Sequence, residues 1–164
     1  MLSSLRNLFK TGVDQREVRR PLWNAVVAVA RAPHWYANGK VPDTLDGRFD
    51  MISLILALVL HRIDDDPDHA LAGVQLTELF VDDMDGQMRQ IGFGDMVVGK
   101  QIGRMVGALG GRLGVYRAPD RSDELKAALI RNLWRGKDAS DDGLTHVMTE
   151  VAKLRAALSV TPVE

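Results

Sequence analysis

The chain has 164 residues, of which 46% are hydrophobic and 26% charged, with no cysteine and a formal net charge of −1. This length suits one domain better than two, and the lack of cysteine excludes disulfides, thiolate metal sites and a thiol nucleophile. The near-neutral charge argues against a dedicated nucleic-acid binder, because such proteins usually carry a basic footprint.

Apolar residues recur three and four positions apart almost throughout the chain, which predicts α-helices rather than strands. We therefore expect an all-α fold, a compact single-domain bundle of six or seven helices. In this prediction residues 1–12 are a short amphipathic N-terminal segment and residues 13–160 are the helical domain. The main helices are expected, in chain order, at residues 22–31, 44–64, 68–91, 95–117, 124–135 and 142–158.

Turn-forming residues separate these helices. Two prolines and a glycine in residues 33–42 predict a loop or short turn that presents the aromatic pair Trp35 and Tyr36. The sequence Gly-Phe-Gly at residues 92–94 ends one long helix, and Asp95 can cap the next.

Two segments bear on contact with a membrane. The most apolar run, residues 51–60, is too short to span a bilayer, so it predicts a buried central helix. The N-terminal segment predicts a short cationic amphipathic helix, which either rests on an anionic bilayer or packs on the domain. Its apolar residues are Leu2, Leu5, Leu8 and Phe9, and its cations are Arg6 and Lys10.

The helix expected after Asp95 carries six glycines on one face, although an interior glycine costs up to about 1 kcal/mol relative to alanine. A smooth face lets another helix approach closely. That helix belongs either to this domain or to another chain, and the sequence leaves both alternatives open. Lys100, Arg104 and Arg112 lie on another, basic side of the same helix. The glycines are Gly99, Gly103, Gly107, Gly110, Gly111 and Gly114.

Asp82, Asp83 and Asp85 form the densest acidic group within a predicted helix. Asp82 and Asp85 share one helix face and could hold a magnesium ion, so a magnesium-dependent enzyme is one alternative. A solvated face or a docking surface for basic partners is the other. Because no histidine spacing, nucleophile motif or phosphate-binding loop supports catalysis, we expect no enzyme, no cofactor and no metal site.

A basic patch near Trp23 gives a further alternative. Arg16, Arg19 and Arg20 could make the chain a ribosome-associated or RNA-associated binding module, with no specific nucleic-acid sequence expected. A solvated surface is the simpler explanation.

Two sequence blocks resemble a known family. The first is V-P-D-T-L-D-G-R-F-D-M at residues 41–51. The second runs from L-F-V-D-D-M-D at residues 79–85 to M-R-Q-I-G-F-G-D-M-V-V-G-K at residues 88–100. In combination they are similar to the ubiquinol-cytochrome c chaperone family, the assembly factors for respiratory complex III in mitochondria and alphaproteobacteria. The resemblance covers roughly residues 22–116 and is weaker as far as Trp134.

The resemblance implies a non-catalytic role in assembly. Mitochondrial members bind newly made cytochrome b together with a small partner subunit near the ribosomal tunnel exit. It therefore implies cytochrome b as client, with a small partner subunit, the ribosome and the inner-membrane surface as further partners. Because the chain lacks the long targeting extension of those members, we expect a bacterial form that works in the cytoplasm or at the inner face of the membrane.

We expect the client surface around the second block. Glycine and methionine there suit an apolar client, and the acidic group suits the positive loops that membrane proteins keep on the cytoplasmic side. The expected partner-binding residues are Asp82, Asp83, Asp85, Arg89, Gly94, Asp95, Met96, Lys100, Gly103, Arg104 and Gly107.

Overall fold

Within the residues that the structure describes, the chain consists of helices and the turns between them. The structure, a computed structural model, describes residues 14–163, and this range contains no β-strand. The predicted all-α bundle of six or seven helices is confirmed, whereas the predicted segment 1–12 lies outside the described residues. The elements are η1 (Gln15–Arg19), α2 (Arg20–Ala30), α3 (His34–Ala37), α4 (Leu45–Asp64), η2 (Pro67–His69), α5 (Ala70–Gln90), α6 (Asp95–Val115), α7 (Asp123–Leu133) and α8 (Asp141–Ser159).

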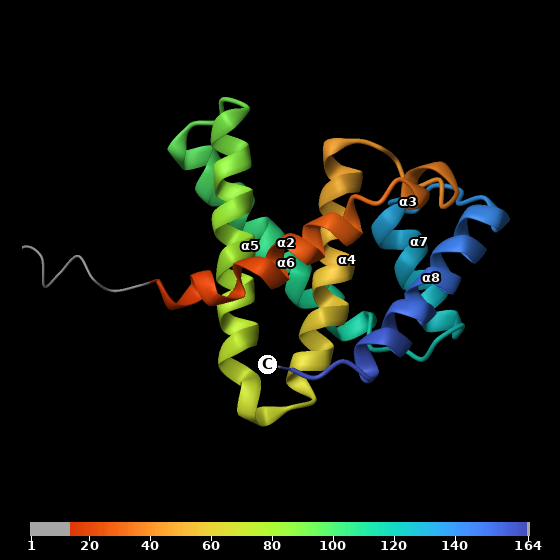
Figure 1. The fold of residues 1–164 in the computed structure, drawn as a ribbon. Helices are drawn as coiled ribbons and strands as arrows, with labels where there is room; N and C mark the ends of the chain where they lie inside the picture. Colours follow the sequence, from red (N-terminus) through yellow and green to blue (C-terminus); the bar gives the residue numbers. More distant parts are fainter. Residues whose placement is uncertain (1–13, 164) are drawn as a thin grey trace, which may run out of the picture.

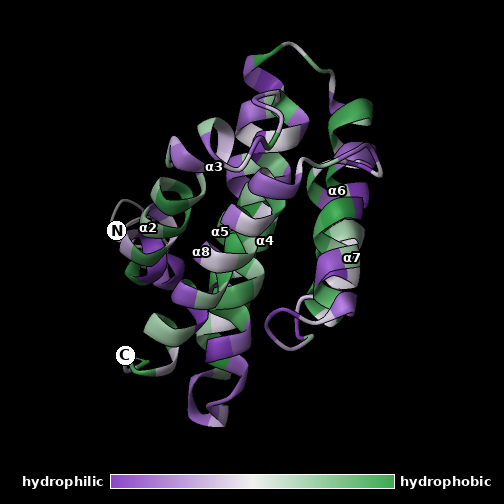
Figure 2. Ribbon diagram, turned by 90° about the vertical axis from the view of Figure 1, so that its right-hand side faces the viewer, coloured by the Kyte–Doolittle hydropathy of each residue, from purple (hydrophilic) through white to green (hydrophobic). Residues whose placement is uncertain are grey.

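The long helices α4 and α5 form an antiparallel pair at the centre of the fold (Figure 1). Helix α2 crosses one side of this pair and α6 lies on the opposite side, as the turned view in Figure 2 shows. Helices α7 and α8 pack against the other flank of α4. The far end of α5 and the start of α6 project away from the other helices as a hairpin, at the top left of Figure 1.

Helix α4 forms the middle of the hydrophobic core. Every residue from 51 to 60 is buried, as expected for a helix that is apolar on all sides. Each fully buried leucine of this helix contributes roughly 1.5–3 kcal/mol through removal of apolar surface from water. No helix within residues 14–163 is both long enough and apolar enough to cross a membrane.

Hydroxyl side chains begin three of the helices. The side chains of Thr44, Ser122 and Ser140 each accept a hydrogen bond of 3.1 Å from the third backbone N–H that follows, which satisfies a donor of the first turn. Gly47, in the first turn of α4, has no room for a side chain, because a Cβ there would lie 1.8 Å from the backbone oxygen of Pro42. The first turn of α4 therefore packs directly on the preceding backbone.

The segment between α2 and α4 is more ordered than the sequence predicts. It contains the short helix α3, and the prediction that it presents both aromatic residues is wrong. Trp35 is buried and donates from Nε1 to the backbone oxygen of Val29 at 2.7 Å. The Tyr36 hydroxyl donates to the backbone oxygen of Ala30 at 3.0 Å. Both rings therefore cap the carbonyl end of α2 instead of projecting into solvent.

One carboxylate is buried beside the apolar run of α4. Asp50 is fully buried and accepts a hydrogen bond of 2.7 Å from Nη2 of Arg112 on α6. It also accepts one of 3.1 Å from Nε of Arg135, just beyond α7. The Arg112 guanidinium lies 5.3 Å from the centre of the Phe49 ring, close enough for a cation–π contact. Because an unpaired buried charge costs several kcal/mol, this cluster fixes how α6 and the end of α7 pack on α4.

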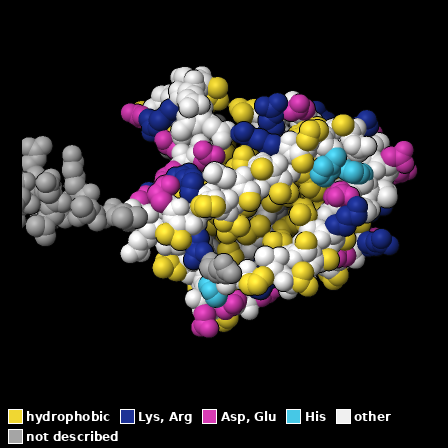
Figure 3. Space-filling model, in the orientation of Figure 1, with side chains coloured by type: hydrophobic (Ala, Val, Ile, Leu, Met, Phe, Trp, Pro, Cys, Tyr) yellow, Lys and Arg dark blue, Asp and Glu magenta, His cyan; other side chains and the backbone are white. Residues whose placement is uncertain are grey.

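The surface also carries hydrophobic side chains. On the face in Figure 3 they gather in a central hollow, and charged side chains lie mostly around it. Several large apolar residues are exposed outright, among them Val18 on η1, Leu45 on α4 and Val74 on α5. Exposed apolar groups that cluster often mark places where a partner or another segment docks.

The substitution Asp50→Asn should lower the free energy of unfolding by about 3 kcal/mol, because it leaves the buried Arg112 charge without its partner. Chemical denaturation of the two proteins measures this difference. The matched control is Asp46→Asn, one helical turn earlier on α4, where the side chain is 72% exposed and its ion pair with Arg135 is longer, at 3.6 Å. We expect a change within about 0.5 kcal/mol for the control. Equal effects of the two substitutions would contradict the role given to Asp50.

Two histidines join α3 to α8. The Nδ1 atom of His34 lies 3.0 Å from Nε2 of His146, a contact that two protonated rings could not make because both atoms would then be donors. Burial lowers the pKa of His34 below its ordinary value of 6.5, an effect opposed by the nearby Glu150 carboxylate and aided by His146 and Lys153. The folded chain therefore resists protonation of His34.

Stability should consequently fall as the pH decreases below about 6.5, because the unfolded chain binds a proton there that folded His34 does not. The contribution is fully present above that pH and is lost on acidification. We expect His34→Gln to reduce the decrease in urea midpoint between about pH 7.5 and about pH 5.5. An identical decrease in the variant and the unaltered chain would show that His34 does not contribute.

Candidate functional site

The hairpin between α5 and α6 turns through Gly92, whose φ of +95° is in the left-handed region that glycine adopts without strain. Arg89 links the two helices by donating to Asp85 on α5 at 2.7 Å and to Asp95 at the start of α6. The hydrogen bonds to Asp85 and then Asp95 raise the pKa of Arg89 above its usual range. The predicted cap is displaced by one residue, since Gly94 is the N-cap and Asp95 is the first helical residue.

Apolar side chains surround this turn and point into solvent. Met96 is 91% exposed, Ile91 56%, and Phe93 and Val97 44% each. Sequence analysis placed Met96 in the site but missed the other three. The signal was present, because residues next to a glycine-containing turn between two helices lie at the end of a hairpin, where little can cover them. We call these four residues the hairpin tip.

The glycine face of α6 is open. All six glycines are exposed, and a Cβ added at any of them would meet no atom of the described chain within 4 Å, apart from its own helical neighbourhood. No helix within residues 14–163 therefore fills the strip, and of the two alternatives, packing inside this domain is wrong for that range. The glycines lower the stability of α6 without improving any packing that the structure contains.

The inward side of α6 holds the helix to the core. Val98 and Leu109 are buried, and Ile102, Met105 and Leu113 pack against the core cluster. This apolar side faces α4 and α5 and leaves the glycine face turned outward.

The basic side of α6 is divided in two. Lys100 and Arg104 are exposed and have no ion-pair partner within residues 14–163. Arg112, expected to contact acidic or phosphate groups of a partner, is instead bound to the buried Asp50. Only the first half of α6 therefore presents free positive charge beside the glycines.

The acidic group of α5 is engaged within the chain. Asp82 pairs with Nη1 of Arg16 at 2.7 Å, and Asp83 accepts a hydrogen bond of 3.3 Å from Nε1 of Trp23. Asp85 pairs with Arg89. Because Asp82 and Asp85 bind different arginines, they do not converge as magnesium ligands, and the described range contains no group of three or more potential metal ligands. These carboxylates hold α5 against η1 and α2 and close the hairpin.

The basic patch on η1 and α2 is also occupied by contacts inside the chain, which removes most of the donors that a phosphate backbone would need. Its arginines contact side chains from η1 and α5 or immediately beside them. The contacts are Arg16 with Asp14 at 2.7 Å, Arg20 with Glu17 at 2.7 Å, and Arg19 with the Gln75 amide oxygen at 3.3 Å.

The sequence matches a family model described as ubiquinol-cytochrome C chaperone over residues 37–164. The chain belongs to this family. The match continues through α7 and α8, beyond the point where the two sequence blocks end. Membership supports a role as an assembly chaperone and, from the family's description, a non-enzymatic one.

A solved structure supports the same membership. The chain is similar to the crystal structure of the Cbp3 homolog from Brucella abortus, with 29% sequence identity and a TM-score of 0.75. The similarity covers 99% of this chain and 90% of the Brucella chain. No curated protein sequence matches the chain described here.

The substitutions Gly103→Ala and Gly107→Ala should each raise the free energy of unfolding by about 0.5–1 kcal/mol, since the new methyl groups meet no neighbour and the helix gains propensity. Urea denaturation measures the change. The control is Gly47→Ala, whose methyl group would collide with the backbone oxygen of Pro42 and should destabilise the chain. A loss of stability in the two α6 variants would mean that the glycine face is packed after all.

Proposed function

We propose that this chain is a non-catalytic chaperone that holds newly made cytochrome b during assembly of ubiquinol-cytochrome c reductase. Its client surface comprises the open glycine face of α6 and the hairpin tip. The family supports the assembly role. The observation that carries the placement is the exposure of six interior helix glycines for which the described chain provides no packing partner.

A glycine face is suited to a transmembrane helix as client. Without side chains in between, two helix backbones approach closely and make extensive van der Waals contact, which adds to the gain from removing the client's apolar surface from water. The hairpin tip adds flexible and aromatic apolar groups at one end of the strip, with Met96 the most exposed. Together they offer a cytochrome b helix temporary cover from water.

Charges beside the strip would orient the client. Lys100 and Arg104 suit acidic loops of the client or lipid phosphates next to it. Asp82 and Asp85, although paired, remain partly exposed and suit the positive loops on the cytoplasmic side. Action in the cytoplasm or at the inner face of the membrane follows from this proposal. A small partner subunit and the ribosome remain predictions from the family resemblance.

Replacing both Gly103 and Gly107 with leucine should reduce the cytochrome b that co-purifies with the tagged chain about tenfold, the effect of roughly 1.4 kcal/mol of lost contact. The reason is that two leucines would keep the client helix at a distance. In a strain that lacks the unaltered gene, the same variant should also lower the b-type haem absorbance of the membranes. Both quantities are measured against the unaltered chain.

The control is Ala156→Leu, a similar enlargement at an exposed position of α8. It should leave capture and haem content unchanged. Full capture by a folded Gly103→Leu, Gly107→Leu variant would contradict the placement on α6. Normal b-type haem in the deletion strain itself would contradict the assembly role.

A further inference from the structure

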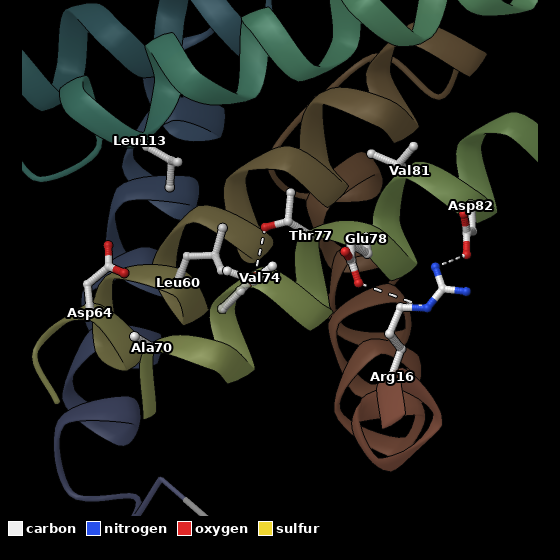
Figure 4. A pocket seen from close by; sticks show the side chains of 11 residues that line it. Arg16, Leu60, Asp64, Ala70, Val74, Thr77, Glu78, Val81, Asp82 and Leu113 are labelled. Atoms are coloured by element: carbon white, nitrogen blue, oxygen red, sulfur yellow. Dashed lines mark hydrogen bonds and ion pairs between the residues drawn. The ribbon is translucent and has the colours of Figure 1, made fainter. Parts of the chain in front are cut away.

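Two cavities of the described chain differ in how their polar side chains are paired. In the groove between α4 and α5 (Figure 4), Arg16 lies 2.7 Å from Asp82 and 3.9 Å from Glu78. Asp64, at the other end of this groove, lies 2.9 Å from Arg117. The charges of the groove are therefore paired within the chain, whereas a smaller cavity between α6 and α7 has polar groups without partners.

The cavity between α6 and α7 has a volume of about 260 Å³. Arg112 lines it from α6, and Arg131 and Asn132 line it from α7. The other lining residues are small or apolar, namely Ala108, Gly111 and Val115. No carboxylate of the described chain lines the cavity, so the charged groups on its wall are both positive.

Two buried donors at this cavity lack acceptors. Arg112 binds Asp50 through Nη2 at 2.7 Å, but its other terminal nitrogen, Nη1, is buried and has no hydrogen-bond partner in the described chain. Nδ2 of Asn132 is also buried without a partner there. A buried donor without an acceptor costs free energy, because the donor has lost its hydrogen bonds to water. Two such donors at one cavity indicate a ligand that carries acceptor atoms.

The charges around the cavity favour an anion over a water molecule as this ligand. The guanidiniums of Arg112 and Arg135 are balanced by two carboxylates. These are Asp50 and Asp46. Arg131 is exposed and has no ion-pair partner within residues 14–163, so it leaves one positive charge in excess beside the two buried donors. A water molecule would accept hydrogen bonds at this place but would not neutralise that charge.

We propose that the cavity between α6 and α7 binds a phosphate group. Guanidiniums bind phosphate through charge-assisted hydrogen bonds, which partial burial strengthens. The donors come from two helices, which suits a tetrahedral group with oxygens on several sides better than a planar carboxylate. At about 260 Å³ the cavity is smaller than the roughly 300–1,000 Å³ pockets that enclose whole ligands, so it takes the phosphate and leaves the rest of a larger molecule outside. Free phosphate and a lipid headgroup both supply such a group.

An NMR titration of the purified, ¹⁵N-labelled chain with inorganic phosphate, at constant ionic strength, tests the proposal. The side-chain amide signal of Asn132 should shift in a saturable way. Arg131→Gln should weaken phosphate binding about tenfold, because a charge-assisted hydrogen bond is lost. The control is Lys126→Gln, which removes the same charge from an exposed position of α7 outside the cavity and should leave binding unchanged. Circular dichroism checks that both variants are folded.

Vesicles distinguish the two sources of the phosphate. Tighter binding to vesicles that contain phosphatidic acid than to phosphatidylcholine vesicles, lost in Arg131→Gln but not in Lys126→Gln, would assign a lipid headgroup. A shift of the Asn132 signal with free phosphate and no such preference among vesicles would assign free phosphate.

Two results would overturn the proposal. One is binding of phosphate and vesicles that does not depend on Arg131, or no binding of either. The other is a shift of the Asn132 signal that acetate produces as strongly as phosphate, which would assign the cavity to carboxylates. None of these measurements uses a client, so a negative result here would leave the proposed chaperone role untouched.

Discussion

The buried Asp50 carboxylate is the constraint on which the arrangement of the helices depends. A charge in the middle of an apolar core is tolerated only where cations and hydrogen-bond donors meet it, and both cations come from other parts of the chain, Arg112 on α6 and Arg135 after α7. Apolar packing of residues such as Val98 and Leu109 already holds α6 on α4 and α5. The ion cluster adds a directional contact, and the two together determine which side of α6 faces outward.

On the outward side of α6, the requirements of stability and of the proposed function differ. The inward residues of α6, such as Val98 and Leu109, bury apolar surface in the ordinary way. The glycines opposite weaken the same helix and gain nothing from the described fold. A helix that is held firmly along one side tolerates such a loss of stability along the other. The ion cluster around Asp50 therefore allows α6 to keep a smooth surface for the proposed client.

Much of the fold could be predicted from the sequence, and the predictions that were wrong have physical reasons. Helical periodicity located α5 and α6 to within a few residues because each buries a regular apolar face, and α4 was located as an apolar run between charged residues. Asp50 looked like one of several charges before the apolar run, since no local pattern distinguishes a buried carboxylate whose partners lie 62 and 85 residues away. The prediction for Trp35 was wrong although its partner, the backbone oxygen of Val29, is only six residues away, because the turn after α2 is what brings the two together. The six glycines were recognised, but only the fold could show that their face is open.

The distance in sequence between Asp50 and its two cations affects the order of folding. Arg112 and Arg135 follow Asp50 by 62 and 85 residues, so a growing chain that has completed α4 and α5 still contains a carboxylate without its cations. Closing the core at that stage would desolvate the charge without compensation. The nascent chain is therefore favoured to stay open until α6 and the end of α7 have both been synthesised, and final closure becomes a late, cooperative event rather than a succession of independently stable intermediates.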